Sequence, residues 1–415
     1  MKKDVIVIGG GIIGVASAYY LALQGRSVML IEKDKVCAGA SHGNAGLIAN
    51  GFAIPLAAPG AAIQGIKMML DSSGPFYIKP RLNLELLRWL WKFHNACNEK
   101  QMQRSIRILL ALGQGSFELF DELLATEKIK FDYERKGRLI LFSSEKSFAS
   151  GMADVKLLAE FGVEASLLDA EGVRQFEPNV MPTVKHGIFC SSYGHVSPDL
   201  FTHKMARLAA VQGVEIKTAT AVNGFEKSAQ KITTVVTAED SYSADQIVLA
   251  GGAWSPEIVG SLKLRLPIQP AKGYSLTYKC PPNSPQLPLS LSERKVAVTP
   301  MGEKLRFTST FELVGFDPSV NQRRLEMIRS SAQEYLSGMD ELEDETVWSG
   351  YRPATPDDLP IIGRSEKYEN LVLATGHGTL GMTHSLITGK LVAQIMANEQ
   401  PSIDLKALSP ERFYN

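Results

Sequence analysis

The chain lacks an excess of charge of either sign. Among its 415 residues, Lys and Arg together number 44 and Asp and Glu also number 44, so the formal net charge is zero. Proteins that bind nucleic acid through its phosphates usually carry a basic excess, and none is present here. We therefore expect no nucleic-acid partner.

Cysteine is scarce as well. The four cysteines, at positions 37, 97, 190 and 280, form no CxxC pair and show no metal-ligand spacing. This pattern argues against a bound metal and against a disulfide framework, and it favours buried thiols in a reducing compartment. We expect a cytoplasmic protein without a metal site.

Long hydrophobic runs are absent. No stretch of about 18 unbroken apolar residues exists, so the sequence predicts no transmembrane helix. The N-terminal MKKDVIVIGGG begins with two lysines, as a signal peptide does, but glycines interrupt its short apolar run before any cleavage site. We interpret this run as the first strand of the mature fold.

The first 32 residues have the pattern of one βαβ unit. Val5–Ile8 is a β-branched apolar run, typical of a buried parallel strand, and a helical pattern follows from Ile12 to about Gln24. Gly25 stands where a glycine ends a helix, and Ser27–Ile31 is a second apolar strand followed by Glu32.

The glycines between this strand and helix satisfy the GxGxxG pattern. Gly9 permits a tight turn, Gly11 lets the backbone approach a pyrophosphate, and Gly14 lets the helix pack on the strand. The helix N-terminus offers free N–H groups to the phosphates, and Glu32 is placed to accept hydrogen bonds from ribose hydroxyls. An acid at this point disfavours NADP but does not separate NAD from FAD.

The other end of the chain carries a second unit of this kind. An apolar strand at Leu371–Ala374 is followed by a glycine-rich turn, Gly376–Gly381, and by a helix that we expect to begin near Leu380 and to end near Asn398. Between the two ends, segments such as Tyr274–Lys279 and Leu305–Thr310 alternate like antiparallel strands.

We therefore predict an α/β fold: a discontinuous Rossmann-like domain with an inserted α+β domain built on an antiparallel sheet. The cofactor domain is predicted to comprise residues 1–48, 190–262 and 346–415, and the substrate domain residues 49–189 and 263–345.

Four motifs extend this interpretation to a family. They are Ala40–Ile48 (ASHGNAGLI), Lys272–Thr277 (KGYSLT), Gly350–Asp357 (GYRPATPD) and Thr375–Gly381 (TGHGTLG). In order and spacing, over essentially the whole chain, the sequence resembles the D-amino-acid dehydrogenase small subunit. That group belongs to the superfamily of D-amino-acid oxidase, glycine oxidase and sarcosine oxidase.

The resemblance implies FAD, bound by the N-terminal unit and closed over by the C-terminal glycine turn. His42 departs from relatives that attach FAD covalently, so we expect non-covalent FAD. The positions that the motifs and the resemblance assign to FAD are Gly9, Gly11, Ile12, Ile13, Gly14, Glu32, Lys33, Ser41, Asn44, Ala45, Gly46, Leu47, Val222, Gly251, Gly378, Thr379, Leu380, Gly381 and Met382.

The resemblance also implies a substrate site. The arginine of a motif like Gly350–Pro353 holds the substrate carboxylate, which makes Arg352 the candidate here, because a guanidinium binds a carboxylate bidentately. Tyr274 and Tyr351 are candidates to add a hydroxyl to the same carboxylate. A structural salt bridge for Arg352 and simple packing roles for the two tyrosines remain alternatives.

The predicted reaction is oxidative deamination of a D-amino acid to a 2-oxo acid and ammonia, with hydride transfer to the flavin and electrons passed to a quinone or other carrier. Positioning suffices for this chemistry, so we assign no catalytic base to His42, His377 or His384. A glycine/sarcosine-type oxidase, a hydroxy-D-proline dehydrogenase, and a flavin-binding subunit of a larger electron-transfer assembly remain alternatives.

One apolar region suits a surface role. Residues 36–66 contain no charged side chain, and Trp89, Trp91 and Phe93 lie beside Arg88 and Lys92 in the segment after it. Aromatic residues with flanking bases suit the interface between lipid and water, so we predict peripheral contact with the inner face of the cell membrane. An interface in a homo- or hetero-oligomer would use the same residues equally well.

Overall fold

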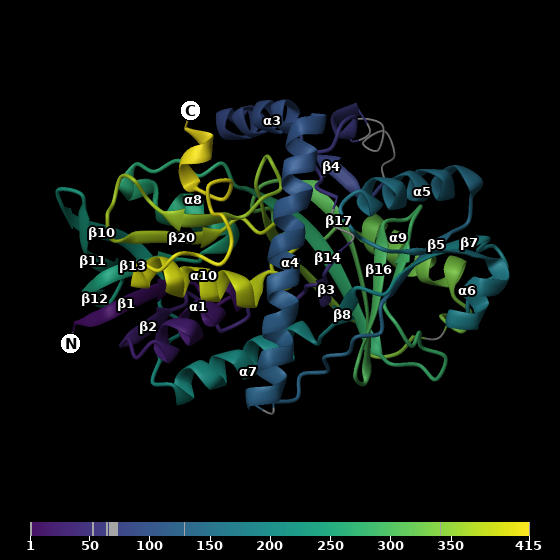
Figure 1. The fold of residues 1–415 in the computed structure, drawn as a ribbon, viewed down its shortest axis with the longest axis horizontal. Coiled ribbons are helices and arrows are strands. Elements are labelled where there is room, and N and C mark those ends of the chain that lie inside the picture. Colours follow the sequence, from purple (N-terminus) through teal and green to yellow (C-terminus); the bar gives the residue numbers. More distant parts are fainter. Residues whose placement is uncertain are drawn as a thin grey trace.

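The computed structural model describes residues 2–51, 54–63, 65, 74–127, 129–340 and 342–414. Two large sheets lie on either side of the long helix α4 (Glu99–Glu127), and both labelled chain ends lie on the side of the parallel sheet (Figure 1). The mixed α/β architecture, with a parallel and an antiparallel sheet, confirms the predicted fold class.

The parallel sheet has the strand order β19-β20-β13-β1-β2-β9, and only β19 runs antiparallel to its neighbour. Its strands come from three separate parts of the chain: β1 (Lys3–Ile8), β2 (Val28–Ile31), β9 (Glu215–Lys217), β13 (Ala244–Leu249), β19 (Ile361–Arg364) and β20 (Leu371–Thr375).

Both faces of this sheet are covered, which explains its continuous apolar runs. In β1, Val5 and Val7 pack with the helices α1 (Ile12–Leu23), α7 (Pro198–Val211) and α10 (Ser385–Ala397). Ile6 and Ile8 point the other way, toward the small sheet of β10 (Val222–Ser228), β11 (Lys231–Thr237) and β12 (Ser241–Tyr242). Side chains of α4 join the first of these two cores.

The second large sheet has nine strands, and most of its pairs are antiparallel. Its strands are β18 (Thr346–Ala354), β14 (Gln269–Lys279), β17 (Lys304–Leu313), β16 (Val296–Met301), β15 (Leu289–Leu291), β5 (Arg138–Phe142), β7 (His186–Cys190), β6 (Ser166–Asp169) and, paired to β17, β4 (Phe76–Ile78).

One face of the nine-stranded sheet packs on helix α9 (Gln322–Tyr335). Tyr274, Leu276, Phe307 and their apolar neighbours on this face form a core with Leu325 and Ile328 of the helix. Since side chains alternate between faces along a strand, the residues between them face the opposite way. That opposite face forms one wall of the cavity described below.

The remaining described elements connect or flank these layers. They are β3 (Leu47–Ala49), α3 (Leu84–Ala96), α5 (Glu145–Ala159), α6 (Ala170–Phe176), β8 (Tyr193–His195), η1 (Gly252–Trp254), α8 (Ser255–Ile258), η2 (Gly260–Leu262) and η3 (Pro410–Phe413).

The predicted domain boundaries remain a prediction, but two elements pack across them. Strand β18 begins at Thr346, which we assigned to the cofactor domain, and yet it is hydrogen-bonded along its whole length to β14 in the nine-stranded sheet. Helix α4, assigned to the substrate domain, packs with α1 and α10. Both elements therefore tie the two regions together.

The uncharged segment 36–66 is mostly loop in its described part, as predicted. It contains one short strand, β3, which pairs antiparallel with β8, and a helical stretch at 61–63. Within the described residues, no helix combines the length and the apolar character needed to cross a bilayer.

Replacing Gly14 by Ala tests how closely α1 packs on β1. A Cβ built at this position would lie 1.9 Å from the carbonyl oxygen of Gly9, so Gly14→Ala must push helix and strand apart. We expect a loss of about 1–3 kcal/mol in the free energy of unfolding, measured by denaturant titration of the protein stripped of cofactor. Gly260→Ala is the matched control, because no atom lies within 4 Å of the added methyl. Equal stabilities of the two variants would contradict this packing.

Candidate active site

A cavity of about 1700 Å³ extends from the carboxyl ends of β1, β2 and β13 to the nine-stranded sheet. This is the end of a parallel sheet at which ligands of α/β proteins bind. Of the residues predicted to bind FAD or substrate, those that line the cavity are Gly9, Gly11, Ile12, Ile13, Glu32, Lys33, Ser41, Asn44, Ala45, Leu47, Val222, Gly251, Tyr351, Arg352, Gly378, Thr379, Leu380, Gly381 and Met382.

The N-terminal glycine turn is built as an anion site. Gly9 has a φ of +114°, and a Cβ there would lie 2.4 Å from the carbonyl oxygen of Ala250. Gly11 is the N-cap residue of α1 and has no side chain that could cap the helix. The first turn of the helix contains no acidic residue. The N–H of Ile12 donates to Ser41 Oγ over 3.0 Å. The positive end of the helix therefore opens into the cavity, and its own first turn has no acid to repel a phosphate.

Two of the residues predicted to bind FAD lie outside the cavity wall. Gly14 packs α1 on the strand, as its predicted role requires. Gly46 has a φ of +72°, its N–H donates to Asn44 Oδ1 over 2.8 Å, and a Cβ there would meet the Val196 carbonyl. Gly46 therefore shapes the loop that carries Asn44 and Ala45 rather than lining the site itself.

Glu32 occupies the predicted place after β2. One carboxylate oxygen accepts the N–H of Gly10 over 2.6 Å, and the other accepts the N–H of Asp34 over 2.9 Å. Each carboxylate oxygen can accept a further hydrogen bond, and Glu32 lines the cavity, so the predicted contact with ribose hydroxyls stays a prediction.

The helix after the C-terminal glycine turn begins later than the sequence predicted. Gly376 and Gly378 have φ values of +75° and +51°, but α10 begins at Ser385, five residues after Leu380. The Thr383 hydroxyl donates to the Leu47 carbonyl over 3.0 Å and accepts the Ala49 N–H over 3.2 Å. This bond to β3 holds the preceding residues as a turn against the cavity, so backbone groups rather than the first turn of the helix face it.

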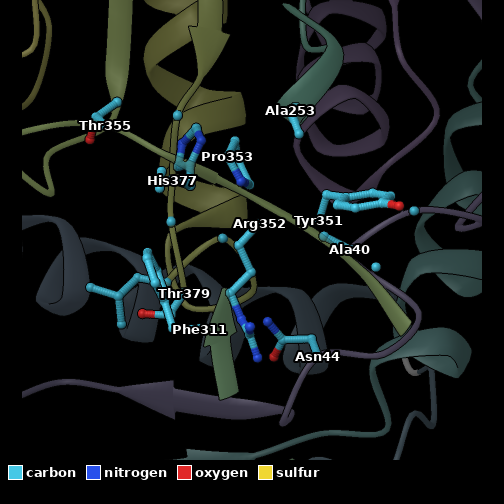
Figure 2. Close-up of a pocket in the computed structure, with 18 of the residues that line it drawn as sticks. Ala40, Asn44, Ala253, Phe311, Tyr351, Arg352, Pro353, Thr355, His377 and Thr379 are labelled. Carbon is cyan, nitrogen blue, oxygen red and sulfur yellow. The ribbon is translucent and has the colours of Figure 1, made fainter. Parts of the chain in front are cut away.

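Arg352 points into the cavity (Figure 2), in the part where Phe311, Thr379 and Asn44 are also drawn. Its Nη1 donates to the carbonyl oxygen of Thr310 over 2.9 Å. Burial lowers the pKa of Arg352 to about 10, and within the described residues no carboxylate lies within ion-pair distance. A structural salt bridge is therefore not the role of this guanidinium, and an anion from a ligand would compensate its charge.

The two tyrosines predicted to contact the substrate lie in different environments. Tyr351 lines the cavity and stands edge-on to Trp254 and Phe316, at ring distances of 6.0 and 5.0 Å. Tyr274 is 1% exposed, accepts the Asn321 N–H through its hydroxyl and packs against α9. The prediction that Tyr274 touches substrate is wrong, because alternation along β14 places its neighbour Gly273, not Tyr274, on the cavity face.

Gly273 has its own function there. A Cβ built on it would lie 1.8 Å from Arg352 Nη1, so only glycine leaves room for the guanidinium. The motif residue that matters for the site is thus the glycine beside the predicted tyrosine.

The histidines are poor proton carriers at neutral pH. Burial lowers the pKa of both His377 and His384 to about 3, and His377 Nε2 lies 3.0 Å from the Thr388 hydroxyl. Burial, helped by the charge of Arg306, also lowers the pKa of His42. Assigning no base to them agrees with these environments.

The sequence analysis missed several cavity-side residues, among them Arg306, Trp348 and Asp358. Arg306, 4% exposed, donates through Nη1 to the carbonyls of His42 and Asn44 over 2.8 and 3.0 Å and so anchors the loop beside the flavin motif. Trp348 fills the space above Gly43 and Gly350. Asp358 accepts the Leu56 N–H over 2.8 Å, and burial raises its pKa to about 7. Asp358 has a φ of +59°, which no sequence signal predicted.

The chain matches known proteins over nearly its whole length. A family model described as FAD dependent oxidoreductase matches residues 4–395. The chain belongs to this family. It is 32% identical to D-amino acid dehydrogenase of Granulibacter bethesdensis and 33% identical to that of Xanthobacter autotrophicus, with 99% of each chain covered.

Solved structures confirm the fold. Glycine oxidase from Geobacillus kaustophilus superposes with a TM-score of 0.80 at 22% identity, covering 99% of both chains. Iminodiacetate oxidase from Chelativorans sp. BNC1 gives 0.74 at 20% identity, covering 98% of both chains.

The site fits FAD, the cofactor of the family. The turn at Gly9 and the open N-terminus of α1 suit a pyrophosphate, and the loop Ser41–Leu47 and the turn after Gly376 enclose the other part of the cavity. None of the four cysteines lines the cavity. His42 does not line it either, and its ring lies 6.5 Å from that of Trp348. Non-covalent binding suits this arrangement.

The purified protein should be yellow, and acid or heat should release intact FAD into the supernatant, because neither His42 nor any of the four cysteines lines the cavity. Absorbance spectra and chromatography of the released flavin check this. Flavin that stays on the denatured chain would refute non-covalent binding alone. A colourless protein that cannot be reconstituted with FAD would refute the assigned cofactor.

Proposed function

We propose that this protein oxidises D-amino acids to 2-oxo acids and ammonia, with electrons passing from the flavin to a quinone or another carrier. The observation that carries the proposal is the partly buried guanidinium of Arg352, which has no acidic partner in the described chain and points into the cavity beside the C-terminal glycine turn. Relatives 32–33% identical over their full length are named D-amino acid dehydrogenase.

Arg352 orients the substrate. Two of its N–H groups bind the α-carboxylate, and Tyr351 and Trp348 from the same strand restrict the position of the α-carbon. FAD, when bound, would supply the acceptor for the hydride of the α-carbon, and water would hydrolyse the resulting imine to the 2-oxo acid and ammonia. The amine must be uncharged before the hydride leaves, and His377 is a poor acceptor for its proton because it is buried and hydrogen-bonded to Thr388.

Replacing Arg352 by Leu should lower kcat/KM for the best D-amino acid roughly 30-fold or more, because losing a buried charge pair costs about 2–5 kcal/mol. Arg352→Lys should also be impaired, since an ammonium cannot form the fork. Both variants should keep FAD, as their visible spectra will report.

The matched control is Arg294→Leu, which removes an exposed arginine that is ion-paired to Glu334 and does not line the cavity. Near-normal kcat/KM in Arg352→Leu would mean that Arg352 does not bind the substrate carboxylate.

The electron acceptor is the finer part of the proposal, and the surface near the cavity supports a lipid-soluble one. Leu90, Phe93 and His94 of α3 line the cavity, as do Ile54, Pro55, Leu56, Ala58, Pro59, Ala61, Ala62 and Gly65. On the outside, Leu82, Leu84, Leu87 and Trp91 are exposed, Trp91 by 66%. We call these four residues the α3 patch. An apolar patch beside a cavity suits shallow burial in a bilayer.

The α3 patch differs from the surface predicted from the sequence. Trp89 is 4% exposed and donates through Nε1 to the Ala354 carbonyl over 2.9 Å, and Phe93 stacks on it at 5.3 Å. Lys92 Nζ donates to the Phe413 carbonyl. The helical period places these three on the inner side of α3 and leaves leucines beside Trp91 outside.

We expect poor peroxide formation, good reduction of a quinone analogue, and flotation with liposomes. Replacing Leu84, Leu87 and Trp91 by Ser should abolish flotation, because the apolar burial is lost. The control replaces Leu167 and Val211, which are exposed elsewhere, by Ser. Rapid stoichiometric peroxide would make this an oxidase, and flotation unchanged by the triple replacement would exclude the α3 patch.

A further inference from the structure

The cavity face of the nine-stranded sheet can be followed strand by strand. Gly350 pairs with Gly273, Ser275 with Thr308, Thr308 with Ala297, and Ala297 with Ser290, which pairs with Ile140 of β5. Partners across strands point to the same face, and so do residues two apart along a strand. Arg352 at one end of this row and Arg138 at the other therefore stand on one face, and both line the cavity.

Arg138 is held rigidly but not neutralised. Its Nε donates to Ser290 Oγ over 2.8 Å, its Nη2 donates to the same oxygen, and its Nη1 donates to the Tyr193 hydroxyl over 3.2 Å. Its guanidinium lies 5.2 Å from the centre of the Tyr193 ring. In the part of the chain that the structure describes, no Asp or Glu forms an ion pair with it.

These contacts leave a fork free. A guanidinium has five N–H groups, and the three hydrogen bonds use one each on Nε, Nη1 and Nη2. One N–H on each Nη remains, which is the pair that binds a carboxylate bidentately.

The spacing of the two arginines suits one small ligand. Arg352 is bonded to Thr310 on β17, and Arg138 to Ser290 on β15, two strands away. Two strand spacings amount to about 10 Å, and Thr310 lies two residues along β17 from Thr308, the residue in the row of Ser290, so the two anchoring residues lie about 12 Å apart. Two carboxylates on a chain of a few carbons, each bound by a guanidinium, span a distance of this order.

We propose that Arg138 binds a second carboxylate, in the side chain of the substrate, so that acidic D-amino acids such as D-aspartate and D-glutamate are preferred over neutral ones. The inference rests on the proposed binding of the α-carboxylate by Arg352. It assigns the two guanidinium groups to the two ends of one dicarboxylic amine.

Other charges on the cavity wall point less clearly to a ligand. Asp154 and Lys295 lie at its rim, where Lys295 is exposed and its charge acts on Asp154. Burial raises the pKa of Asp154 and that of Asp358, which weakens both as anions for a basic side chain. D-lysine and D-arginine are therefore the opposing substrates in the test.

The test compares each acid with its amide. For the FAD-loaded wild type with a dye acceptor, we expect kcat/KM for D-glutamate over D-glutamine, or for D-aspartate over D-asparagine, to be at least tenfold. Arg138→Met should bring this ratio near one, and Arg138→Lys should keep part of it. A ratio measured within one variant is independent of how much of that variant folds.

The matched control is Arg135→Met. Arg135 lies three residues before Arg138, is ion-paired to Asp121 and stands over Phe117 outside the cavity wall. Its replacement should leave the ratio unchanged. A second readout is the change of flavin absorbance on binding glutarate or butyrate, where Arg138→Met should weaken binding of glutarate more than that of butyrate.

Equal use of acid and amide by the wild type, a preference for D-lysine or D-arginine, or an unchanged ratio in Arg138→Met would each overturn the role of Arg138 while leaving D-amino acid oxidation intact. A protein that binds FAD but oxidises no D-amino acid, acidic or neutral, would refute the proposed function and this inference with it.

Discussion

The alternation of side chains across the nine-stranded sheet is the constraint on which the site depends. One face must supply the apolar core with α9, and the residues between are thereby committed to the cavity. A slip of one residue in β14 would exchange Gly273 for Tyr274 beneath Arg352 and fill the space that the guanidinium occupies. The burial of the opposite face thus protects the register that keeps the binding face open.

The second general feature is that two arginines at the site have no carboxylate paired with them in the described chain. Arg352 and Arg306 are both held by backbone carbonyl oxygens rather than by carboxylates, and burial lowers the pKa of each. Carbonyl groups hold the guanidinium in place without cancelling its charge. The negative ends of the two loop carbonyl dipoles partly compensate the charge of Arg306. Arg352, which is also open to the cavity, favours a carboxylate from outside.

Short polar contacts join segments that lie far apart in the chain around the same cavity. Ser41 Oγ accepts the N–H of Ile12 at the start of α1. The Thr383 hydroxyl bonds to the backbone of Leu47 and Ala49 in β3, and the Asp358 carboxylate accepts the N–H of Leu56. The first contact ties a loop to helix α1, the second ties β3 to the turn after β20, and the third ties the loop at Leu56 to the turn between β18 and β19. The loops that enclose the cofactor are thereby ordered by the fold rather than by their own sequence.

What the sequence by itself determined was local. The strand, glycine turn, helix and acid of the first 32 residues follow from periodicity and from backbone demands that only glycine meets, so Gly9, Gly14 and Glu32 could be placed without a structure. Only the tertiary structure decided which side of a strand a residue faces and which distant partner it meets. Tyr274, the start of α10 and the inner side of α3 were misjudged, and Arg306 and Arg138 were missed, because strand register and contacts between remote segments are set by packing of the whole chain.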